Sequence, residues 1–212
     1  MANAPAEKAL GFDCSYAQGT WPGIASDKFV IIRVSSGDGG LHADDRAAQH
    51  IAEARKANKP FAFYHFLGRV GGKVEAQFAV RTMDKLGVWG HKLFCDYEGT
   101  STRSDAIAFI AEAKRLMRPG KWRYRLRKRV GLYSGSTIKE SGGGTLDASF
   151  GWLADYNAYD RPEGWSTTFA RFWQYDSTSI SRGHLDLDAY MGNPKNVARF
   201  FQPIYKSGKL VK

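Results

Sequence analysis

Residues 91–100 read HKLFCDYEGT, an apolar run that ends in two acids one residue apart. Positions 93–95 have the character of a buried strand, and Asp96 and Glu98 follow at its carboxyl end. Alternate residues of a strand share one face, with Cα atoms ~6–7 Å apart, so both carboxylates project into the same space. Two close carboxylates resist simultaneous ionisation, which raises the pKa of one of them and makes it a proton donor near neutral pH.

Seven further apolar runs have strand length, and helical patterns separate those of the first half. The eight predicted strands cover residues 9–13, 29–35, 60–66, 92–98, 130–134, 151–156, 170–175 and 184–190. Helices are predicted over 44–58, 74–86 and 104–117, the last with Ser104 as its N-cap. This alternation indicates parallel βα units. Beyond residue 134 the connections are Gly-rich and short of helix, so we expect an α/β fold: an irregular (β/α) TIM-like barrel with reduced helix content in its second half.

The composition is that of a globular chain of 212 residues, 43% hydrophobic and 25% charged. We expect one domain over residues 1–212, with its core at about 9–192 and a helix or tail at 193–212. No apolar run approaches the ~20 residues that cross a bilayer. Residues 1–13 contain no hydrophobic segment of signal-peptide length, so we expect neither membrane insertion nor conventional secretion.

The net charge is +10, which indicates a polyanionic partner. The excess is concentrated in residues 114–129, which carry nine Lys or Arg and no acid. Nucleic acid, an anionic membrane and a bacterial wall would all attract this segment, and a solvated basic face explains it equally well. Cys14 and Cys95 would both face away from the neighbouring acids, so we expect free thiols in a reducing cytoplasm. Two separated cysteines and five scattered histidines predict no zinc site, and we expect no metal or cofactor.

Polar residues gather near the predicted carboxyl ends of the strands. They are Asp13, His65, Asp96, Glu98, Tyr133, Asp155, Tyr156, Gln174 and Asp186. In (β/α) barrels that end carries the active site, because the loops above it converge on one pocket. Cleavage of a glycosidic bond needs an acid for the leaving oxygen and a second carboxylate that stabilises the sugar carbon or activates water. The longer Glu98 is the candidate acid; a pair that binds Arg, Lys or a divalent cation is the alternative.

Aromatic residues accompany these acids on the predicted strands. They are Tyr64, Tyr133, Trp152, Tyr156, Trp173 and Tyr175. Sugar rings pack their C–H faces on aromatic rings, and their hydroxyls need carboxylates and amides such as Gln174. Each aromatic alone is more often a core residue. Their coincidence with Asp13, Asp96, Glu98 and Asp186 favours a carbohydrate cleft.

Seven segments of the chain, in order, resemble the glycoside hydrolase family 25 muramidases, the Chalaropsis-type lysozymes, many of which are phage endolysins. The matching segments are GFDCSYAQG (11–19), FAFYHF (61–66), FCDYEG (94–99), VGLYSG (130–135), WLADY (152–156), WQYDS (173–177) and LDLDAYMG (185–192). They cover roughly residues 10–192. The departures are VSSGDGG in place of a Thr-Glu-Gly-like turn, with Asp38 an approximate substitute, and a long basic segment at 118–129.

The resemblance implies hydrolysis of the β-1,4 bond between N-acetylmuramic acid and N-acetylglucosamine in peptidoglycan, by an irregular barrel without cofactor. It implies Glu98 as general acid/base, Asp96 as its partner, and Asp13 and Asp186 as the rest of an acidic pocket. The implied sugar contacts are Tyr64, Tyr133, Trp152, Tyr156, Trp173 and Gln174. The family is discussed as retaining, with the substrate's N-acetyl group as a nucleophile that Asp96 orients. Direct attack by Asp96 and inversion stay open.

We expect a monomeric phage-type endolysin, made in the host cytoplasm without a signal peptide and acting on the bacterial cell wall after release. No wall-binding repeats follow residue 192, and His184 is a further candidate substrate contact. A barrel hydrolase acting on chitin or another N-acetylglucosamine polymer is a second reading. A third is a binding protein that uses residues 114–129, with Trp122 and Tyr124, on nucleic acid. This last reading leaves the acids unexplained, since they would repel phosphates, and we expect no specific nucleic-acid partner.

Overall fold

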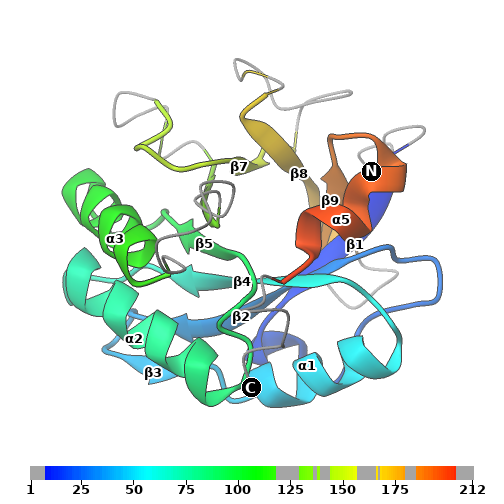
Figure 1. Cartoon of the computed structure of the whole chain (residues 1–212), viewed down its shortest axis with the longest axis horizontal. Helices are drawn as coiled ribbons and strands as arrows, with labels where there is room; N and C mark the ends of the chain where they lie inside the picture. The colour runs from blue at the N-terminus through cyan, green and yellow to red at the C-terminus, as the bar shows by residue number, and fades with distance from the viewer. Residues whose placement is uncertain are drawn as a thin grey trace, which may run out of the picture.

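Eight strands close into a barrel (Figure 1). The computed structural model describes residues 8–117, 129–135, 138, 144–156, 166, 168–179 and 185–203, without the side chains of 178 and 179. The barrel strands are β1 (Ala9–Cys14), β2 (Val30–Ser36), β4 (Phe61–Phe66), β5 (Leu93–Asp96), β6 (Val130–Ser134), β7 (Gly151–Ala154), β8 (Ala170–Ser179) and β9 (Leu185–Tyr190). Their order is β1-β9-β8-β7-β6-β5-β4-β2, and the pairing of β1 with β2 closes the ring. The predicted α/β barrel is confirmed.

All eight predicted strands are present, with bounds that differ by a few residues. The largest difference is β8, which continues to Ser179. β5 ends at Asp96, so Glu98 lies two residues beyond the strand and not on it. A further strand, β3 (His42–Ala43), pairs antiparallel with the end of β2 and was not predicted.

β9 runs antiparallel to both of its neighbours, β8 and β1, whereas the other barrel pairs are parallel. The expectation of parallel βα units is therefore wrong for the last strand. The reason is chain length: only residues 180–184 separate β8 from β9, and a parallel crossover needs about a dozen residues or more. Asp186 consequently lies near the start of its strand, not near the end. It still reaches the same end of the barrel as Asp13, its direct partner in the β1–β9 register.

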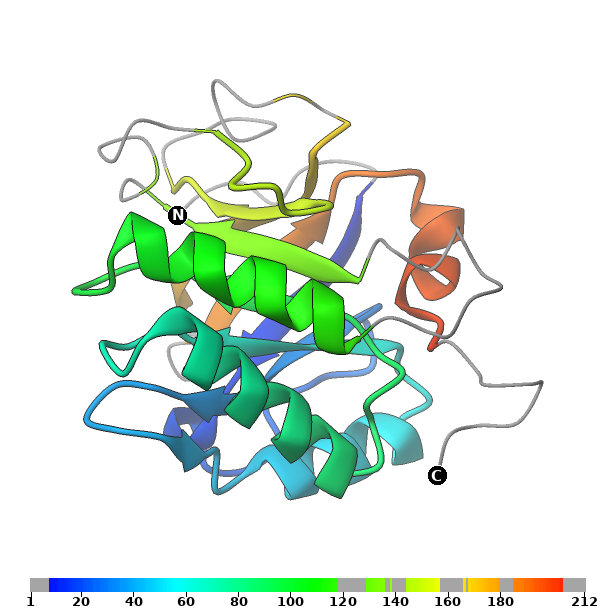
Figure 2. The ribbon, with the colours of Figure 1, turned by 60° about the vertical axis from the view of Figure 1, so that its left-hand side comes forward.

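Three helices pack outside the first half of the barrel, as predicted. They are α1 (Ala47–Lys56), α2 (Gly72–Lys85) and α3 (Arg103–Leu116), and Figure 2 shows them stacked along one side. The N-cap of α3 is Thr102, whose side chain accepts a hydrogen bond from the Asp105 amide, so the expectation of Ser104 is wrong. No helix in the described part of the chain has the length and hydropathy of a membrane span.

The short helices lie near the two ends of the chain. They are η1 (Tyr16–Gln18), η4 (Pro194–Asn196) and α5 (Val197–Phe201). Beyond residue 129, the helices with described bounds are η4 and α5. For the described residues, this confirms the predicted low helix content of the second half. Phe201 of α5 stacks on Phe29, just before β2, with ring centroids 5.4 Å apart, so α5 covers the amino-terminal end of the barrel.

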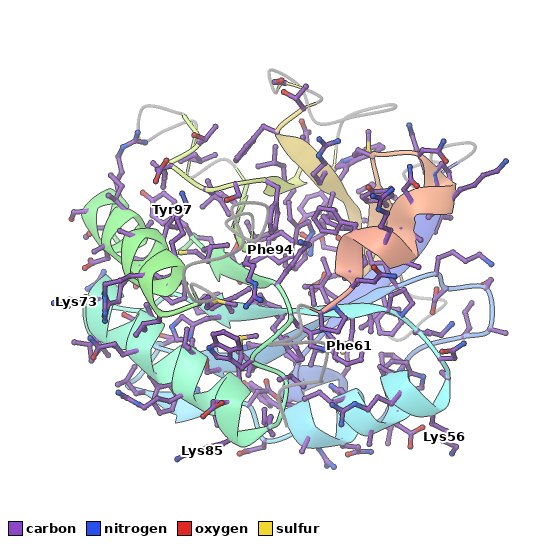
Figure 3. The ribbon with its side chains drawn as sticks, in the orientation of Figure 1. Lys56, Phe61, Lys73, Lys85, Phe94 and Tyr97 are labelled. Atoms are coloured by element: carbon purple, nitrogen blue, oxygen red, sulfur yellow. The ribbon has the colours of Figure 1, made fainter. Side chains whose placement is uncertain are left out.

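Strand alternation sorts the apolar residues into an interior cluster and an outer layer. Phe94 packs in the interior against Trp152 and Phe172, at centroid distances of 5.4 and 5.9 Å. Figure 3 shows Phe94 among the side chains of the barrel and Tyr97 on the side of α3. Cys14 and Cys95 belong to the outer layer and are free and buried, as predicted.

His65 also faces outward, away from the acids with which it was grouped. Its Nδ1 lies 2.8 Å from Ser35 Oγ and its Nε2 lies 2.9 Å from Glu75 Oε2. Burial lowers the pKa of His65, so the neutral ring accepts from Ser35 and donates to Glu75. Glu75 also accepts the backbone N–H groups of Gly68, Val70 and Gly71. Although a serine, a histidine and an acid stand in line, all three are completely buried, so the set is structural and offers no nucleophile to a substrate.

We predict that Glu75→Gln lowers the free energy of unfolding by roughly 2–4 kcal/mol, because a buried amide cannot replace a carboxylate that accepts from four donors. The matched control is Glu53→Gln, at an ion pair of 3.8 Å with the exposed Lys56. Urea unfolding of both variants at neutral pH measures the difference. Equal stabilities of the two variants would contradict a structural role for Glu75.

Candidate active site

The structure brings the four predicted acids to one end of the barrel. Asp13 lies near the end of β1, Asp96 at the end of β5 and Asp186 near the start of β9. Burial raises the pKa of Asp96, and the charges of Glu98 and Asp186 raise it further. Burial also raises the pKa of Asp13, with added contributions from Asp186 and Asp96 among others. The mutual effects show that these groups share one electrostatic site, although their catalytic roles stay predictions.

Depth divides the four acids into two pairs. Asp13 and Asp96 are buried, whereas Glu98 and Asp186 are partly exposed. Burial raises the pKa of Glu98. Burial, then Glu98 and then Asp176 raise the pKa of Asp186 to about 7. Glu98 and Asp186 are therefore the members that both reach solvent and retain a proton at higher pH than an ordinary carboxyl group.

Asp188 is a fifth acid of the site, and the sequence analysis missed it. It is 0% exposed, and its Oδ1 accepts a hydrogen bond of 2.6 Å from Trp152 Nε1. Burial raises its pKa, and Asp188 in turn raises the pKa of Asp13. The signal was available, because Asp188 stands two residues after Asp186 and strand alternation places both on one face.

Gln174 links two tyrosines to Asp13. Its Oε1 accepts the hydroxyl protons of Tyr133 and Tyr156 at 2.8 and 2.7 Å. Its Nε2 donates to Asp13 Oδ2 at 2.8 Å, so both ends of the amide are engaged. Gln174 is buried. Gln174 therefore joins Asp13 to the two tyrosines, and its contact with sugar stays a prediction.

Arg33 of β2 is a cation beside the acids, and it was also missed. Its Nε lies 2.8 Å from Asp44 Oδ2, and its guanidinium group lies 4.6 Å from the ring centre of Tyr16. The charge of Arg33 lowers the pKa of Asp96, opposing the effects of burial and of Glu98. A charged residue inside the otherwise apolar strand sequence FVIIRVS was the signal that could have found it.

The predicted aromatic contacts occupy three different environments. Tyr64, Tyr133 and Trp152 are buried inside the barrel, where the Tyr133 and Trp152 rings lie 4.3 Å apart, so they form the floor beneath the acids. Tyr156 is 45% exposed and can contact a ligand. Trp173 is 0% exposed on the opposite face of β8 from Gln174, and its Nε1 donates to the Asp155 carbonyl. Strand alternation turns Trp173 away from the site, so its assignment as a sugar contact is wrong.

Tyr16 is an exposed aromatic that the sequence analysis did not select. It is 57% exposed, and Arg33 packs on its ring. Its backbone amide donates to Asp44, the partner of Arg33. Tyr16 follows β1 and Tyr156 follows β7, so two exposed rings leave the carboxyl ends of different strands. Within the residues that the structure describes, no group of three potential ligands is placed to hold a metal ion.

The basic segment is described only at its ends, because residues 118–128, which include Trp122 and Tyr124, lie outside the described residues, as does His184. Lys114 pairs with Asp147 at 2.8 Å and Arg115 with Glu112 at 2.7 Å. Arg129 is 2% exposed and lies over the ring of Trp89 at 4.9 Å. The reading of a wholly solvated basic face is therefore wrong at Arg129.

We predict that Asp186→Asn stabilises the protein at pH 8 and leaves its stability unchanged at pH 4. Because the folded pKa of about 7 lies above the ordinary aspartate value of 3.8, the folded state binds more protons between about pH 4 and pH 7. The carboxyl group therefore lowers the free energy of unfolding as pH rises through this window. The full shift corresponds to ~4 kcal/mol, and partial exposure reduces our expectation to ~2 kcal/mol.

Urea unfolding at the two pH values measures this difference. Asp45→Asn, at an exposed position before α1, is the control and should change stability by less than ~0.5 kcal/mol at both. An equal effect of Asp186→Asn at pH 4 and pH 8 would contradict the raised pKa.

Known structures share this fold. A lysozyme from Streptomyces coelicolor has 20% identity and a TM-score of 0.68, covering 92% of this chain and 98% of its own. A family GH25 lysozyme from Aspergillus fumigatus has 19% identity and a TM-score of 0.69, covering 92% and 99%. A family 25 glycosyl hydrolase from Bacillus anthracis has 16% identity and a TM-score of 0.70, covering 95% and 97%. At these identities the likeness shows the fold alone.

Sequence comparison identifies the family. No curated protein sequence matches the chain. The sequence profile of the Glycosyl hydrolases family 25 matches residues 12–184, a range that contains Asp13, Asp96 and Glu98 and ends just before β9. The match extends over most of the chain and over seven of the eight strands of the barrel. The chain therefore belongs to glycosyl hydrolase family 25 and is a glycoside hydrolase.

Proposed function

We propose that this glycoside hydrolase is an N-acetylmuramidase, a lysozyme that cleaves the β-1,4 bond between N-acetylmuramic acid and N-acetylglucosamine in peptidoglycan. The observation that carries the proposal is the set of carboxyl groups at the barrel mouth, whose pKa values are raised by burial and by one another. The structural neighbours named as lysozymes and muramidases support the choice of substrate.

Glu98 is the proton donor in this proposal. Burial raises its pKa, so it holds a proton at a higher pH than an exposed glutamate, while its partial exposure lets a substrate oxygen approach. The loop after it is held in place, because Ser101 Oγ donates to the Glu98 carbonyl at 2.9 Å and Gly99 turns the chain with a φ of +63°. A fixed backbone limits the positions of the side chain, and protonation of a leaving oxygen needs such fixed geometry.

Asp96 is the partner that orients the substrate. Its Oδ1 is buried and has no hydrogen-bond partner among the described residues. A buried acceptor left unpaired costs about 1–3 kcal/mol, so a ligand that supplies an N–H is favoured there. The acetamido N–H of an amino sugar is such a donor. In our proposal this hydrogen bond orients the substrate's own N-acetyl group for attack on the sugar carbon, as in other substrate-assisted glycosidases.

Asp13 and Asp188 are buried beneath the partly exposed acids, and in this proposal they stabilise positive charge on the bound sugar. Both are buried, and Gln174 and Trp152 hold them with N–H donors. The transition state of glycoside cleavage carries positive charge on the sugar ring. Burial and neighbouring acids raise the pKa values of Asp13 and Asp188, and a positive sugar ring opposes that effect and favours their charged form, which stabilises the ring in a site of low dielectric. In this scheme they act through their field, and neither needs to transfer a proton.

The biological role that we propose is that of a phage-type endolysin: a monomer made in the host cytoplasm that acts on the bacterial wall after release. The resemblance to a family with many endolysins supports this role. The net charge of +10 supports it further, because it attracts the protein to anionic wall polymers.

Analysis of the new reducing ends tests the reaction and the substrate together. Purified peptidoglycan is digested and reduced with borohydride, and the amino-sugar alcohols are identified. We expect muramitol, because a muramidase leaves N-acetylmuramic acid at the new reducing end. Glucosaminitol would reject the muramidase assignment and favour a hydrolase of N-acetylglucosamine bonds.

We predict that Glu98→Gln lowers the rate of wall lysis by at least ~10²-fold, because glutamine cannot donate the proton. Its melting temperature should not fall, because the variant removes a carboxyl group that burial disfavours. Glu53→Gln, the partly exposed control on α1 away from the barrel mouth, should lyse walls at the wild-type rate. Turbidity clearing of wall suspensions gives the rates, and wild-type clearing by Glu98→Gln would remove Glu98 from the mechanism.

A further inference from the structure

A cavity lies at the opposite end of the barrel from the acids. Its volume is about 390 Å³, and the polar residues that line it include Lys92, Ser149, Thr168, Arg171, Asn196 and Arg199. Lys92 immediately precedes β5, and Arg171 is the second residue of β8, so both stand where parallel strands begin. Arg199 belongs to α5, which covers this end. The acids, by contrast, stand where the parallel strands finish.

Three cations from different elements converge on this basal cavity. None of the described residues that line it is acidic. Lys92 Nζ lies 4.5 Å from the ring centre of Phe200 and 5.3 Å from that of Phe150, so two aromatic rings hold it at the wall. Burial, and after it the charge of the neighbouring Arg129, lower the pKa of Lys92 to about 8.

We propose that the basal cavity is a binding site for a phosphate ester. Phosphate carries up to two negative charges on several acceptor oxygens, which matches three cations better than a single carboxylate does. Arg171 and Arg199 offer planar forks for paired hydrogen bonds, and Lys92 adds a point charge. The volume exceeds what a bare ion fills, and Phe150 and Phe200 provide apolar walls for the carbon atoms of the ester. The two ends of the barrel can therefore engage ligands at the same time.

Calorimetric titration of the full chain with inorganic phosphate and with glycerol 3-phosphate tests the site. At about pH 7 and ~0.1 M sodium chloride, distant charges are largely screened, so non-specific attraction is weak. We expect saturable binding of both probes, with glycerol 3-phosphate at least as tight as phosphate. Arg199→Gln and Arg171→Gln should each weaken binding roughly tenfold, because each removes a charged hydrogen-bond donor.

Arg81→Gln is the matched control, because Arg81 is exposed on α2 and does not line the cavity. It makes the same change in net charge and should alter the affinity less than twofold, which is about 0.4 kcal/mol. Arg199 is exposed on α5, so its substitution leaves the core intact even where Arg171→Gln impairs folding.

Three results would overturn the proposal: no saturable heat with either probe, equal weakening by Arg81→Gln and Arg199→Gln, or glycerol 3-phosphate binding more weakly than phosphate. The titration involves no turnover, so its failure would leave the proposed muramidase activity untouched. Conversely, phosphate binding would persist in a protein that cleaves no peptidoglycan.

Discussion

Five carboxyl groups share the mouth of the barrel, and the protein must hold them together against their mutual repulsion. Burial and like charge raise the pKa values of Asp13, Asp96, Asp186 and Asp188, so protons neutralise part of the cluster. Hydrogen-bond donors offset another part, from Gln174 to Asp13 and from Trp152 to Asp188. Arg33 supplies the opposing charge at Asp96. Most of the polar architecture inside the barrel follows from this one requirement.

Strand alternation places neighbouring residues of a strand on opposite faces, so residues that face the acids alternate with residues that pack under the helices. In β4, Tyr64 faces the acids, while the next residue, His65, joins Ser35 and Glu75 beneath the helices. In β1, Asp13 faces inward and Cys14 packs in the outer layer. In β8, Gln174 faces inward and Trp173 outward. Two neighbouring polar residues can therefore have unrelated roles, one at the mouth and one under a helix.

This separation explains how far the sequence could predict the site. The eight strands were predictable from apolar runs, and Asp96 with Glu98 from their spacing. Trp173 was predicted as a sugar contact from its place on a predicted strand and from the WQYDS motif, whereas strand alternation places it on the opposite face of β8 from Gln174. Asp188 was missed because the same spacing rule was not applied to LDLD. The direction of β9 depends on the short β8–β9 connection, and the links among Gln174, Tyr133 and Tyr156 join strands that sequence patterns do not pair.

Opposite charge at the two ends of the barrel reconciles catalysis with attraction to an anionic wall. A cationic transition state needs negative charge at the mouth, whereas a chain of net charge +10 is drawn to polyanions through its whole field. Negative charge for the transition state and positive charge for attraction to polyanions would weaken each other only if acids and cations stood at the same end of the barrel. Along β5, Lys92 precedes Asp96 by four residues, a separation of ~13 Å. Burial and neighbouring acids raise the pKa values at the mouth, and Lys92, Arg171 and Arg199 are not among the groups that shift them.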